Sequence, residues 1–224
     1  MNISPSSRHA LNTRPQLRLV PTPALQDRPS GSAPDVPDRV DVFLDMGYVI
    51  RSARTAFGWR VGSRTPDPLT TAREILALRR RPSELGTVHV FDGLHDPARR
   101  PLDHHRMLTW KHQVETSGEV TVHLRPLQYL PDGGFRQKEV DTTLAFAMDD
   151  AARSGHADAI VAFTGDRDLL PAVRRVIAAD VRFESACWGQ RGGIFLPDMR
   201  TWTHRLGRAT YERCIATGEF GDAA

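Results

Sequence analysis

The chain contains 224 residues, of which 40% are apolar, and carries a formal net charge of +3. This length suits one domain of ordinary size with a tail, and the apolar fraction is sufficient for a hydrophobic core. No apolar run approaches the roughly 18–20 residues of a membrane span, and the N-terminus lacks the apolar stretch of a secretory signal. Cys187 and Cys214 are the only cysteines, too few for a disulfide framework. We therefore expect a cytoplasmic protein with no membrane partner.

Composition divides the chain into three parts. Residues 1–38 hold seven of the 16 prolines and show no sustained hydrophobic periodicity, which predicts a flexible Pro/Arg-rich leader. A folded domain is predicted over 39–217, where apolar runs alternate with turn-rich segments. Residues 218–224 are predicted to form a short tail.

The predicted elements of the domain alternate between strands and helices. Short runs rich in β-branched residues indicate strands, and apolar residues at helical spacing indicate helices. In chain order they are a strand over 39–45, a helix over 70–80, a strand over 87–93, a helix over 104–114, a strand over 119–127, a helix over 138–155, a strand over 158–166, a helix over 169–180, a strand over 181–188 and a helix over 199–215. This order predicts an α/β fold with a mainly parallel sheet of five or six strands covered on both faces.

Aspartates lie where the strands of such a sheet would end. Asp45 ends the first strand, Asp166 and Asp168 follow the fourth, and Asp141 lies in the first turn of the preceding helix. Each has a local explanation: Asp168 as a cap of the helix from Leu169, Asp166 as a turn residue, and Asp141 as a complement to the helix dipole. Ligands of open α/β sheets bind at the carboxyl ends of the strands, so we also expect the four acids to converge.

Converging carboxylates repel one another unless a cation neutralises them. Oxygen ligands suit Mg²⁺ or Mn²⁺ rather than Zn²⁺. Such an ion activates water and shields a phosphodiester during in-line attack. The acidic positions therefore predict a divalent metal site.

Three segments together resemble the NYN domain family of bacteria, including its actinobacterial members, within the PIN-like ribonuclease superfamily. They read "VDVFLD", "KEVDTTLAFAMDDA" and "AIVAFTGDRDLLPAV", and the resemblance extends over about residues 39–215. It implies a PIN-like three-layer α/β/α sandwich in which the strand at 39–45 lies beside that at 158–166. It also implies metal-dependent cleavage of RNA that leaves 5′-phosphates. The acids that match the family's catalytic and metal-binding positions are Asp45, Asp141, Asp166 and Asp168.

The first motif departs from the family pattern, since Tyr48 stands where an Asn is expected and Met46 where a Gly is expected. A tyrosine hydroxyl has a different reach from an amide. Two further residues are predicted to support the site. Thr164 is placed to hydrogen-bond a carboxylate or a metal-bound water, and Asp149 matches an acidic family position at which we expect a hydrogen bond or ion pair.

Four basic residues flank the acids and are candidates for RNA contacts. Arg51 and Arg54 follow the first motif, Lys138 precedes Asp141, and Arg167 separates the two acids after the fourth strand. Each is able to hold an RNA backbone electrostatically. The alternatives are a solvated surface position for each arginine and a surface ion pair for Lys138.

The sequence thus predicts a metal-dependent endoribonuclease with RNA as its partner. Tyr48 keeps open a non-catalytic RNA-binding or regulatory module on the same fold. A haloacid-dehalogenase-type phosphatase is a weaker alternative, because that chemistry needs an acid two residues after its nucleophile, and Gly47 occupies that position relative to Asp45. A regulatory protein partner and the oligomeric state remain open.

Overall fold

The computed structural model of the chain describes residues 36–58, 65–194, 196 and 201–216. The predicted tail and nearly all of the predicted leader lie outside these residues. In chain order the elements are β1 (Asp38–Asp45), α1 (Met46–Phe57), α2 (Pro68–Ala77), β2 (Ser83–Leu94), α3 (Pro101–Glu115), β3 (Val120–Pro126), β4 (Gln128–Tyr129), β5 (Phe135–Arg136), α4 (Val140–Ser154), β6 (Ala159–Phe163), η1 (Arg167–Leu169, a 3-10 turn), α5 (Leu170–Ala178), β7 (Arg182–Trp188), β8 (Trp202–Leu206) and α6 (Arg208–Ala216).

Six parallel strands form one sheet in the order β3-β2-β1-β6-β7-β8. This confirms the predicted α/β fold class. The strand at the first motif, β1, pairs directly with β6, the strand that precedes Asp166. The sheet order changes direction here, because the chain moves outward through β2 and β3 and then crosses back to β6. Parallel sheets of this kind have their binding crevice outside the carboxyl ends of the strands at that reversal.

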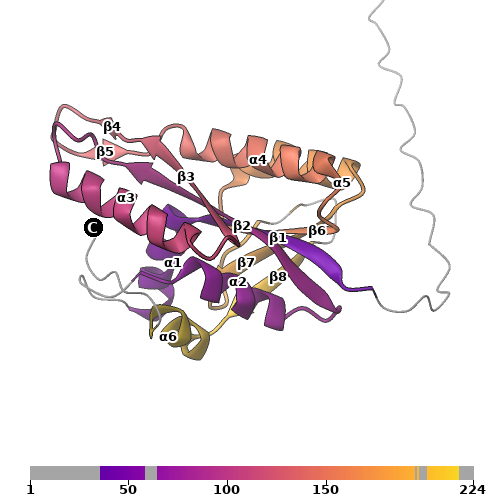
Figure 1. Cartoon of the computed structure of the whole chain (residues 1–224). Coiled ribbons are helices and arrows are strands. Elements are labelled where there is room, and N and C mark those ends of the chain that lie inside the picture. The colour runs from indigo at the N-terminus through magenta and orange to yellow at the C-terminus, as the bar shows by residue number, and fades with distance from the viewer. Residues whose placement is uncertain (1–35, 59–64, 195, 197–200, 217–224) are drawn as a thin grey trace, which may run out of the picture. The chain divides into compact units, whose positions relative to one another are not determined.

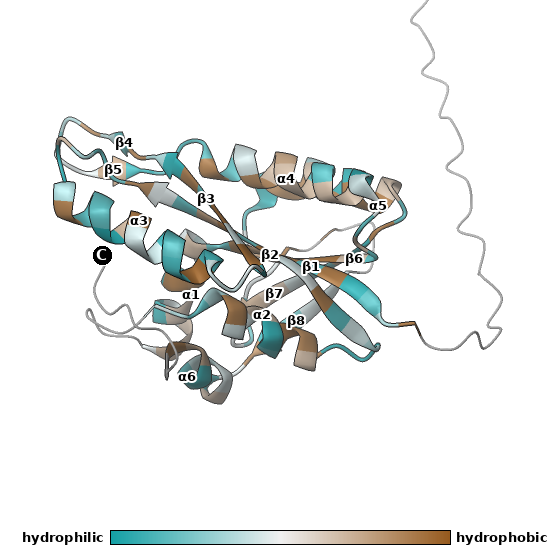
Figure 2. Ribbon diagram, in the orientation of Figure 1, coloured by the Kyte–Doolittle hydropathy of each residue, from teal (hydrophilic) through white to brown (hydrophobic). Residues whose placement is uncertain are grey.

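Helices cover both faces of the sheet, which gives three layers (Figure 1). Alternate residues of β1 face opposite layers, as strand geometry requires. Val42 and Leu44 pack in a core with α1, α2 and α6, whereas Phe43 packs in a second core with α4 and α5. Figure 2 shows apolar residues where β1 and β2 cross the middle of the sheet. Among the described helices, none is both long and apolar enough to cross a membrane.

Helix α1 was not among the predicted elements. Its sequence "MGYVIRSARTAF" contains a glycine and three β-branched residues, so its intrinsic helix propensity is weak. The helix is held by its buried face, which packs Met46, Val49 and Ala53 into the core. Its first turn is closed by the carboxylate of Asp45, which accepts a hydrogen bond from the backbone N–H of Tyr48 at 2.9 Å.

The predicted helix over 199–215 is wrong in its first half. Trp202–Leu206 is strand β8, and only Arg208–Ala216 is helical. β8 pairs along β7, and His204 and Leu206 are buried while Arg205 is exposed. Pairing with a neighbouring strand therefore overrides a segment that read as helical. The small β4–β5 hairpin, whose strands are joined through "PDGGF", was also not among the predicted elements.

Candidate functional site

The carboxyl ends of the three central strands bring polar residues to one edge of the sheet. Asp45, the last residue of β1, lies opposite Phe91 of β2, so the next residue of β2 is a second acid, Asp92. Thr164 immediately follows the end of β6. The site is therefore built on rigid strand ends and the first turns after them.

Asp45 is at the centre of this group and is only 4% exposed. One carboxylate oxygen, Oδ1, caps α1, and the other, Oδ2, accepts a hydrogen bond from Thr164 Oγ1 at 3.2 Å. Burial raises the pKa of Asp45, and the nearby carboxylate of Asp166 raises it further, against the opposing effects of these hydrogen bonds and of Arg51. A buried carboxylate of this kind is costly to keep ionised without a cation.

The turn after β6 holds two further acids in different ways. The Thr164 hydroxyl, which is fully buried, also accepts the backbone N–H of Asp166 at 3.2 Å. Asp166 Oδ1 accepts the N–H of Asp168 at 2.9 Å and so caps η1. The cap is therefore Asp166 rather than Asp168, whose side chain is exposed. Helix α5 has no side-chain cap of its own.

Asp141 reaches the same electrostatic environment from the first turn of α4. Its pKa is raised by partial burial and then by the carboxylates of Asp45, Asp166 and Asp168. The guanidinium group of Arg51 opposes this rise. Asp141 thus lies within the electrostatic influence of the three other acids expected to converge, although the four come from three separate segments of the chain.

A fifth acid, Asp92, was missed by the sequence analysis. Its Oδ1 accepts hydrogen bonds from the N–H of Gly93 at 2.7 Å and from Gln137 Nε2 at 2.8 Å. Removal from water and the neighbouring carboxylate of Asp45 raise the pKa of Asp92 to about 7, although Arg51 and the hydrogen bonds lower it. A sequence signal was present, since Asp92 lies two residues before the end of β2 in "VFDGL", much as Asp45 ends β1 in "VFLD".

Arg51 and Tyr48, both on α1, reach this edge of the sheet as well. Arg51 influences the pKa of Asp45, Asp92 and Asp141. A Cβ atom at Gly47 would lie 2.9 Å from both Arg51 Nη1 and Gln137 Oε1, so glycine leaves room for the two side chains beside the acids.

Tyr48 closes the other side of this edge. Its ring lies so near Gly165 that a Cβ there would be 2.5 Å from Tyr48 Cε2. Its hydroxyl accepts the backbone N–H of Gly193 at 3.3 Å. Burial raises the pKa of Tyr48, so the phenol stays protonated at neutral pH. Tyr48 thus joins the turn after β6 to the segment after β7.

Of the remaining predicted residues, two contact other groups and two are exposed. Asp149 forms an ion pair with Arg175 through two contacts of 2.8 and 2.9 Å and a second with Arg153 at 3.0 Å. These contacts lower the pKa of Asp149 to about 2, Arg175 having the largest effect. Arg54 interacts electrostatically with Tyr211 of α6. Lys138 and Arg167 are both exposed, before α4 and within η1 respectively.

The donor chemistry of the acidic group suits a hard divalent cation, because every candidate ligand is a carboxylate and burial with mutual repulsion disfavours the ionised forms. Within the described ranges, no three or more His, Cys, Asp or Glu side chains are already arranged to hold a metal ion. No protein-family model, curated protein or solved structure matches the chain.

Proposed function

We propose that the protein is a metal-dependent endoribonuclease that hydrolyses RNA phosphodiester bonds at the acidic edge of its sheet. The observation that carries this proposal is the meeting of Asp45, Asp141 and Asp166 at the carboxyl ends of the strands, where burial and then neighbouring carboxylates raise the pKa of Asp45 and Asp141. The carboxylates of such a group repel one another, and a bound divalent cation reduces this repulsion. The resemblance of the three acidic motifs to the NYN domain supports RNA as the substrate.

Mg²⁺ or Mn²⁺ would be held by Asp45, Asp141 and Asp166, with Asp92 and Asp168 beside them. When bound, such an ion supplies an activated water and neutralises charge on the phosphate. The chain itself orients these groups: Thr164 fixes Asp45 and the backbone of Asp166, and Arg51 provides a positive charge for the RNA phosphate. A cytoplasmic location belongs to the same proposal, and the two cysteines, Cys187 and Cys214, are buried.

The Asp141→Asn substitution tests this function. Asparagine removes a charge from the acidic group while keeping the size of the side chain, so the fold should persist. We expect RNA cleavage with Mn²⁺ to fall by roughly 100-fold or more. We also expect Mn²⁺ to raise the melting temperature of the wild type but not of the variant, because ligands that bind only the folded state stabilise it.

The matched control is Asp150→Asn, an exposed acid on the same helix. It should retain both cleavage and the Mn²⁺-dependent shift. If wild-type protein cuts no RNA with Mg²⁺ or Mn²⁺ across single-stranded, duplex and structured substrates, the nuclease proposal fails.

A non-catalytic RNA-binding module is the second candidate. It is favoured by Tyr48, whose hydroxyl accepts a backbone N–H and joins two segments rather than presenting an amide to the acids. The absence of a ready three-ligand group among the described residues favours it as well. RNA retention that is unaffected by EDTA, with no cleavage, would support this candidate, and cleavage lost in Asp141→Asn would exclude it.

A further inference from the structure

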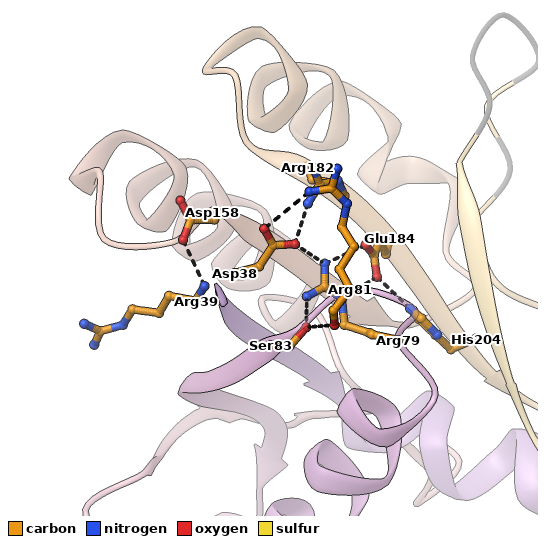
Figure 3. A network of polar contacts seen from close by, with 9 residues as sticks. All are labelled: Asp38, Arg39, Arg79, Arg81, Ser83, Asp158, Arg182, Glu184 and His204. Carbon is orange, nitrogen blue, oxygen red and sulfur yellow. Dashed lines mark hydrogen bonds and ion pairs between the residues drawn. The ribbon is translucent and has the colours of Figure 1, made fainter. Parts of the chain in front are cut away.

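The opposite edge of the sheet, where the strands begin, carries a separate charged network (Figure 3). Arg79 lies between α2 and β2, and its side chain is 1% exposed. Its guanidinium group forms hydrogen bonds to Glu184 through Nε at 2.9 Å and Nη2 at 2.8 Å, and Nη2 also contacts Asp38 at 2.9 Å. Its remaining nitrogen, Nη1, donates to the hydroxyl of Ser83. Every nitrogen of the Arg79 guanidinium group therefore has a hydrogen-bond partner within the protein.

Three other arginines surround this buried pair without being fully engaged. Arg182 contacts Asp38 at 2.6 Å, and Arg81 lies 3.8 Å from the same carboxylate. The guanidinium group of Arg80 lies over the ring of Trp202, 4.8 Å from its centroid. All three arginines are exposed. They therefore have donors that face solvent.

These residues border a pocket of about 150 Å³, which is lined by Arg79, Arg80, Arg81, Arg182, Glu184, Trp202 and His204. Among the described residues, the carboxylates that contact the arginines of this pocket are those of Glu184 and Asp38. The four guanidinium groups therefore outnumber the two carboxylates. A concave basic site of this kind attracts anions.

His204 adds a second, independent sign of a missing ligand. Its side chain is 2% exposed, and Nε2 lies 2.6 Å from Glu184 Oε2. Its other ring nitrogen, Nδ1, is buried and has no hydrogen-bond partner among the described residues. Buried polar atoms in folded proteins nearly always have a partner.

We propose that this pocket binds the phosphate group of a nucleotide, with the base against Trp202. A pocket of this volume has room for several waters or for a phosphate group. Guanidinium groups match phosphate oxygens in a bidentate manner. Trp202 is 50% exposed beside the pocket, and aromatic rings at such positions stack on bases.

This site is separate from the acidic edge. Strand β7 begins at Arg182 and extends for seven residues, or about 20 Å, towards the carboxyl edge. The phosphate held here is therefore a different one from any phosphodiester cleaved beside Asp45. The two sources of such a phosphate are a free nucleotide and a distant part of a bound RNA strand.

Binding measurements without divalent ions test the site, because they do not depend on cleavage. In EDTA, calorimetry would compare AMP, inorganic phosphate and adenosine, and anisotropy would follow a fluorescein-labelled 12-nucleotide oligoadenylate. We expect Arg81→Gln to weaken phosphate-dependent binding by about tenfold, because it removes one charge-assisted contact. Trp202→Ala should weaken binding of AMP but not of inorganic phosphate.

The matched control is Arg106→Gln on α3, since the side chains of Arg81 and Arg106 are 62% and 58% exposed and each lies near one aspartate. It should bind as the wild type does. If AMP binding is lost in Arg81→Gln but kept in Arg106→Gln, the ligand is a free nucleotide. If Arg81→Gln loses binding of the oligonucleotide only, the ligand is RNA. If Arg81→Gln and Arg106→Gln bind every ligand equally, with both folded by thermal unfolding, the site does not exist.

Discussion

At the scale of single residues, the buried carboxyl group of Asp92 makes the stability of the protein depend on pH. Its pKa in the folded protein is about 7, against a reference value of 3.8. A carboxyl group whose pKa is raised on folding costs nothing below its unfolded pKa, and the cost grows as pH rises towards the folded pKa. The full cost is therefore present above pH 7.

Replacing Asp92 with asparagine should remove this cost. The asparagine carbonyl keeps the hydrogen bonds from Gly93 and Gln137. We expect Asp92→Asn to raise the free energy of unfolding at pH 8 by on the order of 3 kcal/mol and to have little effect near pH 3.5. Urea denaturation at the two pH values measures this difference.

Asp132→Asn is the control, because Asp132 accepts a comparable backbone contact from Gly134 at an exposed site. It should change stability little at either pH. An Asp92→Asn variant that is no more stable at pH 8 would mean that the carboxyl group is well solvated.

At the scale of elements, helix α1 depends on a residue that also belongs to the acidic edge. Asp45 caps the helix through Oδ1, and asparagine is an equally good cap. We therefore expect Asp45→Asn to abolish cleavage while α1 stays folded. Asp45→Ala should lower the free energy of unfolding by about 1–2 kcal/mol relative to Asp45→Asn, because the N–H of Tyr48 loses its acceptor.

Asp67 offers a matched comparison at the start of α2, where its Oδ1 accepts the N–H of Thr70 at 2.7 Å. Asp67→Ala should cost about 1 kcal/mol for the lost cap and leave cleavage unchanged. If it impairs cleavage as much as Asp45→Asn does, the effect of Asp45 is one of general stability rather than of the site.

At the scale of the whole molecule, the Arg79–Glu184 pair joins the starts of several strands. Glu184 on β7 also meets His204 on β8, and Arg79 meets Asp38 on β1. Burial alone would raise the pKa of Glu184, but the hydrogen bonds from His204 and Arg79 bring it down to about 2. The stabilisation is therefore present above about pH 4.5 and is lost as pH falls towards 2.

Glu184→Gln should lower the free energy of unfolding at pH 7 by about 3 kcal/mol, because it leaves a buried guanidinium group without its main partner. The difference from the wild type should shrink between pH 4.5 and 2.5 in chemical denaturation. Glu212→Gln, an exposed position on α6, should behave as the wild type at every pH. A constant difference across this range would show that the pair does not titrate as described.

The alternation of strands and helices was predictable because it depends on local patterns. The strand at 158–166 and the helix starts around 138 and 169 can be recognised from residues that are close together in the sequence. The acids at the ends of these elements can be recognised in the same way. Elements that rely on distant partners were not predictable in this way. β8 depends on pairing with β7, and α1 depends on packing against the sheet.

The sequence by itself therefore determined the fold class and the positions of Asp45, Asp141, Asp166 and Asp168 relative to strand ends and helix starts. Only the tertiary structure added Asp92 to this group and brought Arg79 to Glu184, 105 residues away. The physical reason is that secondary structure follows short-range periodicity, whereas sheet order is set by long-range pairing. The charge that each carboxyl group carries depends on which distant groups that pairing places beside it.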